Sequence, residues 1–506
     1  MSFAVLAAAA ALALGLGAAR AGSTSDRAPS AAECREAAAH RTLRPLQSYE
    51  PRPGAIRVFA MQFKQEVRHV VSYASFRTAI ECQIRRYVVP HLSPSEPNVV
   101  AFNEDIGLMT LGTGSRGAAA RELIQHPSSA CAGQGAPCGA AVALGALSAG
   151  YSREISYYRS RYFPDMGPLS GIFVGATDTL VRGFMTTFSD LARRYDIYIL
   201  GSSDQAPFRA STDPADISQL ADPDLPAPKF VYLATRPEAY NEVFLWSPRN
   251  VRRTGPRPLR NLVAQNRKVP VTDIEKLIEI SPGPSTGPAA IANLRPYRVP
   301  GSQARIGFAT SLPAFRYGKP PPGVDPCSDT ARYYMRCLDR LGANVVIQDE
   351  ANPGPWAAPG GDSDWQPLEW MRSTWRHVAG GRLHFAYNVT PFLVGNLADL
   401  AFDGQSAITQ RGLRGRGCHF IGNRRLQPGD PPRYRHYAGP KSQFLLLAPW
   451  VTGDGPRERL RTTAERLGPG SGDKLENDYL ETALIADLTF PPDPDRRGCI
   501  RRPPGG

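Results

Sequence analysis

A short apolar run that ends in a carboxylate does most to constrain how this chain can fold. Val99 to Phe102 is apolar enough for a buried strand, and Glu104 follows it just before the chain turns. A buried strand that ends in an acid can hold the carboxylate rigidly, as a general base requires. Acids after strands are also common in solvated turns and helix caps, so this motif alone does not identify a site.

Apolar runs and helical stripes alternate along the rest of the chain. They predict strands at Ile56–Phe63, Asp196–Gly201, Lys229–Leu233, Glu242–Trp246, Ile306–Thr310 and Asn344–Ile347, and helices at Ser75–Tyr87, Thr177–Arg194 and Thr330–Leu341. The runs at Lys229–Leu233 and Glu242–Trp246 are interpreted as the two strands of a hairpin. Strands that alternate with helices in this order predict an α/β fold.

Further polar side chains follow predicted strands downstream of Glu104. Lys268 follows the predicted hairpin, in the segment NRKVPVTDIEKL, which also contains Glu275. Ser311 stands where the strand Ile306–Thr310 must turn sharply. Charged groups that each follow a core strand are candidates for one shared pocket.

The order of these segments resembles the nitrilase, or carbon-nitrogen hydrolase, superfamily. In that family an acid, a lysine in "RKxxL" and a cysteine in "GxxxC" form the catalytic triad. Here GANVVIQDEANP at 342–353 is similar to the family's "GADxxxxPAN" strand, and FDGQSAI at 402–408 is similar to its "GxSxI" strand. The similar segments lie between about residues 56 and 490, with large insertions.

The resemblance implies a fold and a chemistry. The expected fold is a nitrilase-like four-layer α-β-β-α sandwich over residues 51–492, with an insertion at 111–172 that is either a surface elaboration or a lid. The expected activity is hydrolysis of non-peptide carbon-nitrogen bonds in a small-molecule amide or nitrile. In that activity Glu104 would move protons, Lys268 would hold the developing negative charge and Glu275 would orient Lys268. The family also implies a homodimer.

The nucleophile position departs from the family pattern. Counting from Gly307 as "GxxxC" requires leads to Ser311, whose hydroxyl is a weaker nucleophile than a thiolate. Cys327 begins a Cys-Ser-Asp sequence at a predicted helix start, where a thiol pKa is lowered, but a loop would have to bring it back. Three interpretations follow: a hydrolase that uses Cys327, a hydrolase or acyltransferase that uses Ser311, or an inactive nitrilase-fold binding protein.

The N-terminal segment and the cysteines predict export. The chain is apolar from Phe3 to Ala19 and then has the small-x-small pattern Ala19-Arg20-Ala21, so residues 1–21 are predicted to be a secretory signal peptide. Residues 22–50 are expected to be a flexible linker, and 493–506 a C-terminal tail. Eight cysteines are an even number, as in disulfide-bonded exported proteins, and Cys131 and Cys138 are the easiest pair to close.

Composition and motifs exclude several function classes. The net charge of +13 could attract an anionic partner, but the arginines lack the aromatic residues and modules of nucleic-acid binding, so we expect no nucleic acid. The positive charge is compatible with contact between the protein and the cell surface. The sequence has no CxxC and no HExxH, and we expect neither a metal nor another cofactor.

Overall fold

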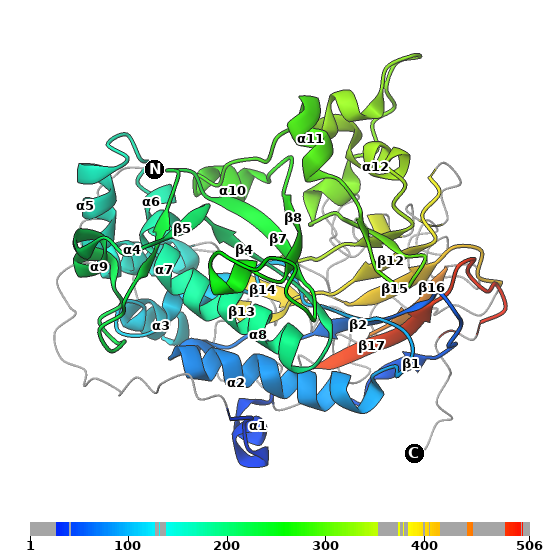
Figure 1. Cartoon of the computed structure of the whole chain (residues 1–506), viewed down its shortest axis with the longest axis horizontal. Helices are drawn as coiled ribbons and strands as arrows, with labels where there is room; N and C mark the ends of the chain where they lie inside the picture. The colour runs from blue at the N-terminus through cyan, green and yellow to red at the C-terminus, as the bar shows by residue number, and fades with distance from the viewer. Residues whose placement is uncertain are drawn as a thin grey trace.

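The computed structural model describes most of the chain between residues 27 and 498. The described residues are 27–39, 42–126, 131, 138–352, 373–374, 378, 383–397, 400–403, 405–414, 443–448, 481–496 and 498. They form a mixed α/β structure in which helices surround two large sheets (Figure 1). The α/β class predicted from the sequence is therefore confirmed.

The first sheet brings the Glu104 strand to its middle. Its strand order is β1-β17-β2-β3-β4-β7-β8, with bounds Leu46–Ser48, Thr482–Leu488, Ile56–Gln62, Asn98–Ala101, Tyr198–Gln205, Tyr240–Trp246 and Leu262–Arg267. Strands β2, β3 and β4 are parallel, so their carboxyl ends meet at one edge. Strand β7 runs antiparallel to both β4 and β8.

The second sheet brings the Ser311 strand next to the segment that follows β11. Its order is β16-β15-β12-β11-β10-β9, with bounds Phe444–Leu447, Ala407–Gln410, Tyr387–Thr390, Val345–Ile347, Arg305–Phe308 and Tyr297–Arg298. Strands β10, β11 and β12 are parallel, so the segments after β10 and β11 lie at the same edge.

Apolar side chains from the two sheets pack against each other in one cluster. Val99 and Leu200 of the first sheet belong to the same buried cluster as Ile306 and Val345 of the second. The other faces of the sheets are covered by helices: α2 (Tyr73–Gln83) and α8 (Thr186–Arg194) on the first, and α12 (Thr330–Arg340) on the second. Because both faces of each sheet are buried, the sequences of these short strands are continuous apolar runs.

The remaining described elements surround this core. The range predicted as an insertion, 111–172, contains α3 Ala118–Gln125, α4 Cys138–Gly150, α5 Ser152–Arg161 and the start of α6 Ser170–Gly175. The elements after it are α7 Thr177–Leu180, α9 Pro214–Leu220, α10 Asp273–Leu277, α11 Gly287–Asn293, β13 Val394–Leu397 and β14 Leu400–Asp403. The helix predicted at Thr177–Arg194 is present as α7 and α8, joined by a π-helical turn at Val181–Met185.

The predicted hairpin between residues 229 and 246 is wrong. Strand β6 (Val231–Ala234) pairs with β5 (Phe208–Ser211) in a separate two-stranded sheet. Strand β7 instead joins the first sheet between β4 and β8. Both runs have strand-like composition, but pairing is decided by which neighbour completes a buried face, and this is not local information.

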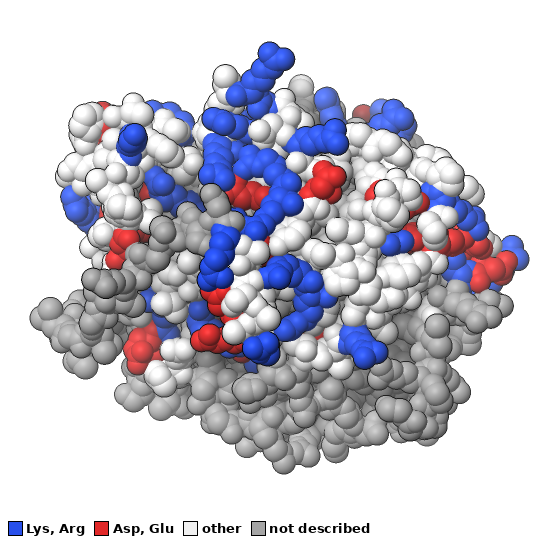
Figure 2. Space-filling view, turned by 60° about the horizontal axis from the view of Figure 1, so that its bottom comes forward, with Lys and Arg blue, Asp and Glu red and all other residues white. Residues whose placement is uncertain are grey.

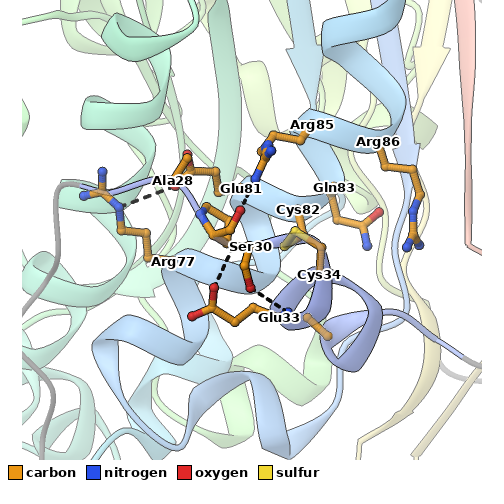
Figure 3. The surroundings of a disulfide bond; sticks show 12 residues. Ala28, Ser30, Glu33, Cys34, Arg77, Glu81, Cys82, Gln83, Arg85 and Arg86 are labelled. Atoms are coloured by element: carbon orange, nitrogen blue, oxygen red, sulfur yellow. Dashed lines mark hydrogen bonds and ion pairs between the residues drawn. A yellow bond between two sulfur atoms is a disulfide. The ribbon is translucent and has the colours of Figure 1, made fainter.

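The prediction of a flexible linker at 22–50 is wrong for the part of that range that the structure describes. Helix α1 (Ala31–Ala37) begins with a capping box between Ser30 and Glu33, and the Cys34–Cys82 disulfide attaches it to α2 (Figure 3). Strand β1 pairs with β17 at the sheet edge. Low apolar content suggested a linker because composition cannot reveal a covalent cross-link. The predicted signal peptide at 1–21 lies outside the described residues.

Three disulfides join cysteines of the described part of the chain. They are Cys34–Cys82, the predicted Cys131–Cys138 pair and Cys327–Cys337, and none of these cysteines is free. The predicted tail from 493 is tied down near its start, where Arg496 forms an ion pair with Glu50. No helix among the described residues has the length and apolar character needed to cross a membrane.

Candidate functional site

Glu104 lies just beyond β3 at the carboxyl edge of the first sheet, and its side chain is 4% exposed. Its Oε1 accepts a hydrogen bond from Lys268 Nζ at 2.7 Å, and its Oε2 accepts one from the Ala351 backbone N–H at 3.0 Å. Both oxygens of this buried carboxylate therefore have donors, as a buried charge requires.

Lys268 follows β8, and a hydrogen bond from its backbone N–H to the Asn241 carbonyl oxygen holds it beside β7. Its ammonium group contacts Glu104 Oε1 and, at 3.0 Å, Glu275 Oε1. Glu275 lies in α10, where Thr272 caps the helix and donates to Glu275 Oε2. The sequence-predicted Glu104, Lys268 and Glu275 therefore meet in one buried cluster.

Asn241 joins the same cluster, and the sequence analysis missed it. Its Nδ2 donates to Glu104 Oε1 at 2.8 Å and to Glu275 Oε1 at 2.9 Å, the same two oxygens that Lys268 contacts. The ammonium and the amide thus bridge the two carboxylates from two positions. No sequence pattern singled it out, because it lies one residue before the predicted strand Glu242–Trp246 and only the structure includes it in β7.

Burial and charge set the protonation states of the cluster. Burial is the main cause that raises the pKa of Glu104 to about 7; Glu275 and Asp349 add to the rise, and Lys268 opposes it. Burial also favours neutral Lys268, but Glu104 and Glu275 outweigh it and raise the Lys268 pKa. For Glu275, Lys268 and Thr272 outweigh the effect of burial, so its pKa is lowered. A charged lysine beside a carboxyl that titrates near neutrality suits proton transfer.

Ser311 occupies the sharp turn between β10 and the short helix Leu312–Phe315. Its backbone has φ 51° and ψ −114°, which a residue with a side chain rarely adopts, and the residue is 4% exposed. Its backbone N–H donates to the Asp349 carbonyl oxygen, and its Oγ donates to Asn352 Oδ1 at 3.2 Å. Strained turns of this kind present nucleophilic serines in other hydrolase folds.

Residues 349–352 connect Ser311 to Glu104. Asp349 accepts hydrogen bonds at 2.8 Å from Ser202 within β4 and from Thr310 just after β10, so it ties the two sheets together. Ala351 binds Glu104, and Asn352 accepts from Ser311. Glu350 accepts a hydrogen bond from Asn352 Nδ2 at 2.7 Å, which orients the amide toward Ser311. The sequence analysis used this segment as a family match and did not assign roles to its side chains.

The interpretation that Cys327 is the nucleophile is wrong for this structure. Its sulfur is bonded to Cys337 of α12, so it offers neither a thiol nor a thiolate. The helix start that would have lowered its pKa is present, with Asp329 as the cap of α12. The same local sequence fits a reactive thiol and a disulfide-bonded cysteine. The position of Cys337 in the folded α12, within bonding distance of Cys327, decides between them.

Among the residues that the structure describes, no group of three or more His, Cys, Asp or Glu side chains is arranged to hold a metal ion. The acids near Lys268 instead pair with nitrogen donors or face one another. The contacts of Lys268 with Glu104 and Glu275 support proton transfer and stabilisation of negative charge by the ammonium group.

Similar solved structures are carbon-nitrogen hydrolases. A carbon-nitrogen hydrolase from Helicobacter pylori is 11% identical, with 83% of this chain and 95% of that chain covered and a TM-score of 0.38. A double mutant of an amidase from Nesterenkonia sp., in complex with acrylamide, is 12% identical, with 87% and 93% covered and a TM-score of 0.35. The amidase from Nesterenkonia sp. itself is 14% identical, with 71% and 84% covered and a TM-score of 0.32.

These similarities are distant both in sequence and in overall superposition. No protein-family model matches the chain, and no curated protein is similar to it. What the chain does therefore has to be derived from its own residues.

Proposed function

We propose that this protein is an exported hydrolase of small-molecule amides or nitriles that uses Ser311 as nucleophile. The observation that carries the proposal is the buried contact of Glu104, Lys268 and Glu275, linked to Ser311 through residues 349–352. Burying two carboxylates and an ammonium is costly, and the sequence keeps them at the carboxyl edge of the sheet, where sites commonly lie. We propose the nitrilase-like four-layer sandwich as the architecture of the whole chain.

In the proposed acylation step, Ser311 Oγ attacks the amide carbon while Glu104 accepts the hydroxyl proton. The carbonyl oxygen becomes an oxyanion that Lys268 stabilises, because two of its three N–H groups bind Glu104 and Glu275 and the third is available. When the carbon–nitrogen bond breaks, Glu104 returns the proton to the leaving amine. The products of this step are a serine ester and a free amine or ammonia.

In the proposed deacylation step, a water molecule attacks the ester carbon and gives its proton to Glu104. Collapse of the second intermediate breaks the bond to Ser311, and Glu104 returns the proton to Oγ. Atoms balance: amide and water yield a carboxylic acid and an amine. An acyltransferase would differ only in the acceptor that replaces water.

A second candidate function is ligand binding without turnover. One observation favours it: Ser311 Oγ donates to Asn352, and Glu104 already accepts from Lys268, Asn241 and Ala351, so the base does not contact the nucleophile. Catalytic contacts often form only when substrate is present, so this geometry is compatible with both functions.

The test uses a panel of simple aliphatic amides and nitriles with ammonia release as the measurement. We expect release by the natural protein, and intact mass under quench should show an acyl group that peptide mapping places on Ser311. If ammonia is not released but an amide still shifts the melting temperature, the binding function replaces the hydrolase.

Export is proposed from the apolar N-terminal segment and is compatible with the three disulfides. We expect the mature protein to begin near Gly22, and intact mass of secreted material checks it. A mass that includes Met1 would contradict export by cleavage. The proposed homodimer is tested separately, by light scattering of the mature protein.

A further inference from the structure

Asn241 sits at the centre of the buried charge cluster, yet it is neither acid, base nor nucleophile in the proposed mechanism. Its two amide hydrogens bind Glu104 Oε1 and Glu275 Oε1. An amide can make these contacts only in one of its two orientations, because rotation by half a turn would place Oδ1 against both carboxylates. Some neighbour must therefore favour the observed orientation.

The neighbour in the right position is Asp204 of β4. Asp204 and Asn241 are directly paired across β4 and β7, so their side chains leave the sheet on the same face with Cβ atoms about 5 Å apart. They are 2% and 1% exposed, and Asp204 Oδ1 and Asn241 Oδ1 both lack a hydrogen-bond partner. A single proton on the Asp204 carboxyl group would satisfy both oxygens through one hydrogen bond.

The surrounding charges favour that proton. Burial raises the pKa of Asp204 well above its usual range, Glu275 and Glu104 raise it further, and Lys268 opposes the rise. Asp105, which follows Glu104 in the chain, also has an unpartnered buried oxygen and a pKa raised by burial and by Asp204. Glu104, Asp105, Glu275 and Lys268 are thus the titratable groups around Asp204.

We propose that Asn241 is a positioning residue for the catalytic cluster, and that a neutral Asp204 donates to its Oδ1 and holds its amide toward Glu104 and Glu275. The inference deepens the proposed hydrolase function and rests on it only for the kinetic readout. Without the amide, Glu104 and Glu275 would have Lys268 alone to screen their mutual repulsion, and the carboxyl of Glu104 would become harder to ionise.

The main variant is Asn241→Ala. We expect the acid limb of the kcat/KM pH profile to move up by about one pH unit, with kcat reduced more than KM is changed. Asn261→Ala is the matched control, because Asn261 is also buried and doubly bonded but binds Ser189 and Ser247 away from the cluster. We expect it to lose stability without moving the pH profile.

The Asp204 variants test the second step. Asp204→Asn keeps a donor for Asn241 Oδ1, whereas Asp204→Ala removes it, so the alanine variant should shift the profile more than the asparagine variant. An equal shift in both would overturn the role of Asp204, and an unmoved profile in Asn241→Ala would overturn the role of Asn241.

A readout without turnover separates this inference from the hydrolase proposal. The pH dependence of the melting temperature reports the titration of buried carboxyls in any folded protein. If no substrate is found, a changed dependence in Asn241→Ala but not in Asn261→Ala would still support the positioning role. Identical dependences in the natural protein and both variants would overturn it.

A second inference comes from a basic surface that is formed by the β7–β8 connection and the end of α8. The β7–β8 connection contains Arg249, Arg252, Arg253, Arg257 and Arg260 and no acid, and Arg193 and Arg194 end the adjacent α8. Arg193 binds Asn250, and Val251 and Arg252 both donate to the Arg260 carbonyl oxygen, so the loop is structured. The side of the molecule that carries α2 and α8 faces forward in Figure 2, which shows Lys and Arg gathered in a band.

The acids beneath this basic surface neutralise only part of it. Asp190 pairs with Arg193 and Arg257, and Glu81 pairs with Arg194, so these two buried acids stand against seven arginines of the surface. Arginine binds phosphate groups through paired N–H donors. Val251 is 59% exposed between these arginines, which suits the boundary between headgroups and acyl chains.

We infer that the basic surface binds anionic phospholipid headgroups at a bilayer surface. The mature protein should sediment with vesicles of phosphatidylcholine and phosphatidylglycerol but not with phosphatidylcholine alone, and added salt should weaken the binding. The Arg252→Glu, Arg253→Glu double variant should lose it. The control is Arg295→Glu with Arg298→Glu, which changes net charge equally at exposed positions elsewhere.

Equal loss of sedimentation in the two double variants would overturn the inference, because net charge alone would then explain binding. Sedimentation that soluble double-stranded DNA abolishes at equal phosphate concentration would also overturn it, in favour of a polyanion site. Retained vesicle binding in the presence of that DNA, lost only in the Arg252 and Arg253 variant, would support it.

Discussion

The acid–base half of the site and its nucleophile half are built by different means. Glu104, Lys268 and Glu275 are held by short contacts among charged groups that are almost fully buried. Ser311 makes one side-chain hydrogen bond, at 3.2 Å, and owes its place to an unusual backbone turn. The comparison teaches that buried charges must find one another to be tolerated, whereas a neutral hydroxyl has to be positioned by the main chain.

This difference separates the effects of substitutions. Removing a charge from the acid–base half should disturb both folding and chemistry, because its partners are left uncompensated. Changing Ser311 should affect chemistry alone. Substitutions in each half test this division, and the change at Lys268 should have the greatest effect.

Lys268→Ala should remove activity and lower the free energy of unfolding by about 3–5 kcal/mol, because Glu104 and Glu275 lose their shared cation. Urea denaturation measures the stability. Lys276→Ala is the control: this lysine lies on α10 with a 61% exposed side chain, and its pair with Asp273 is solvated. Equal destabilisation by the two variants would contradict a charge cluster held by Lys268.

Ser311→Ala should reduce turnover at least about a thousandfold while leaving the denaturation midpoint close to that of the natural protein. The exposed Ser328 supplies the control variant Ser328→Ala, which should keep full turnover. A Ser311→Ala protein that still releases ammonia at the natural rate would remove the serine from the mechanism. Retained ligand affinity without any turnover in the natural protein would favour the binding function.

The pH dependence addresses Glu104. Because the base must be ionised and its pKa is raised to about 7, kcat/KM should fall by about tenfold per unit as pH decreases below that value. Stability should depend on pH in the opposite direction from kcat/KM. A carboxyl whose pKa is higher in the folded than in the unfolded state contributes stability that is fully present below its unfolded pKa and lost as pH rises through about 7.

Glu104→Gln checks both signs at once. The variant should lose activity at every pH. Between about pH 4 and about pH 8, its free energy of unfolding should change less than that of the natural protein. A natural protein whose kcat/KM stays constant as pH falls well below neutrality would exclude Glu104 as the base.

Cys327→Ser should have the smallest effect on catalysis. Its disulfide closes a loop with a sequence separation of 10, so the chain-entropy estimate of the loss is about 3 kcal/mol of stability. Turnover measured well below the melting temperature should stay within about twofold, as for surface changes outside a site. Cys337→Ser, which breaks the same bond, is the matched variant. A loss of turnover in Cys327→Ser alone would return Cys327 to the mechanism.

Part of this structure could be predicted from local sequence. The strand before Glu104, the α/β alternation and the Cys131–Cys138 bridge each depend on a few neighbouring residues. Lys268 and Glu275 could be placed as candidates through the resemblance of their segment to the nitrilase superfamily. Asn241 could not, since one polar residue in a strand does not show what it contacts.

Contacts between residues that are distant in the chain could be seen only in the folded protein. Strand β7 pairs with β4 and β8 rather than with β6, α1 is attached to α2 by Cys34 and Cys82, and Cys327 is bonded to Cys337. Glu104 and Lys268 are 164 positions apart yet in contact. Which residues form strands and which carry charge can be predicted from the sequence, because those are local properties. Which strands pair and which charges meet follows from burying all the apolar faces at once, and this depends on the whole chain.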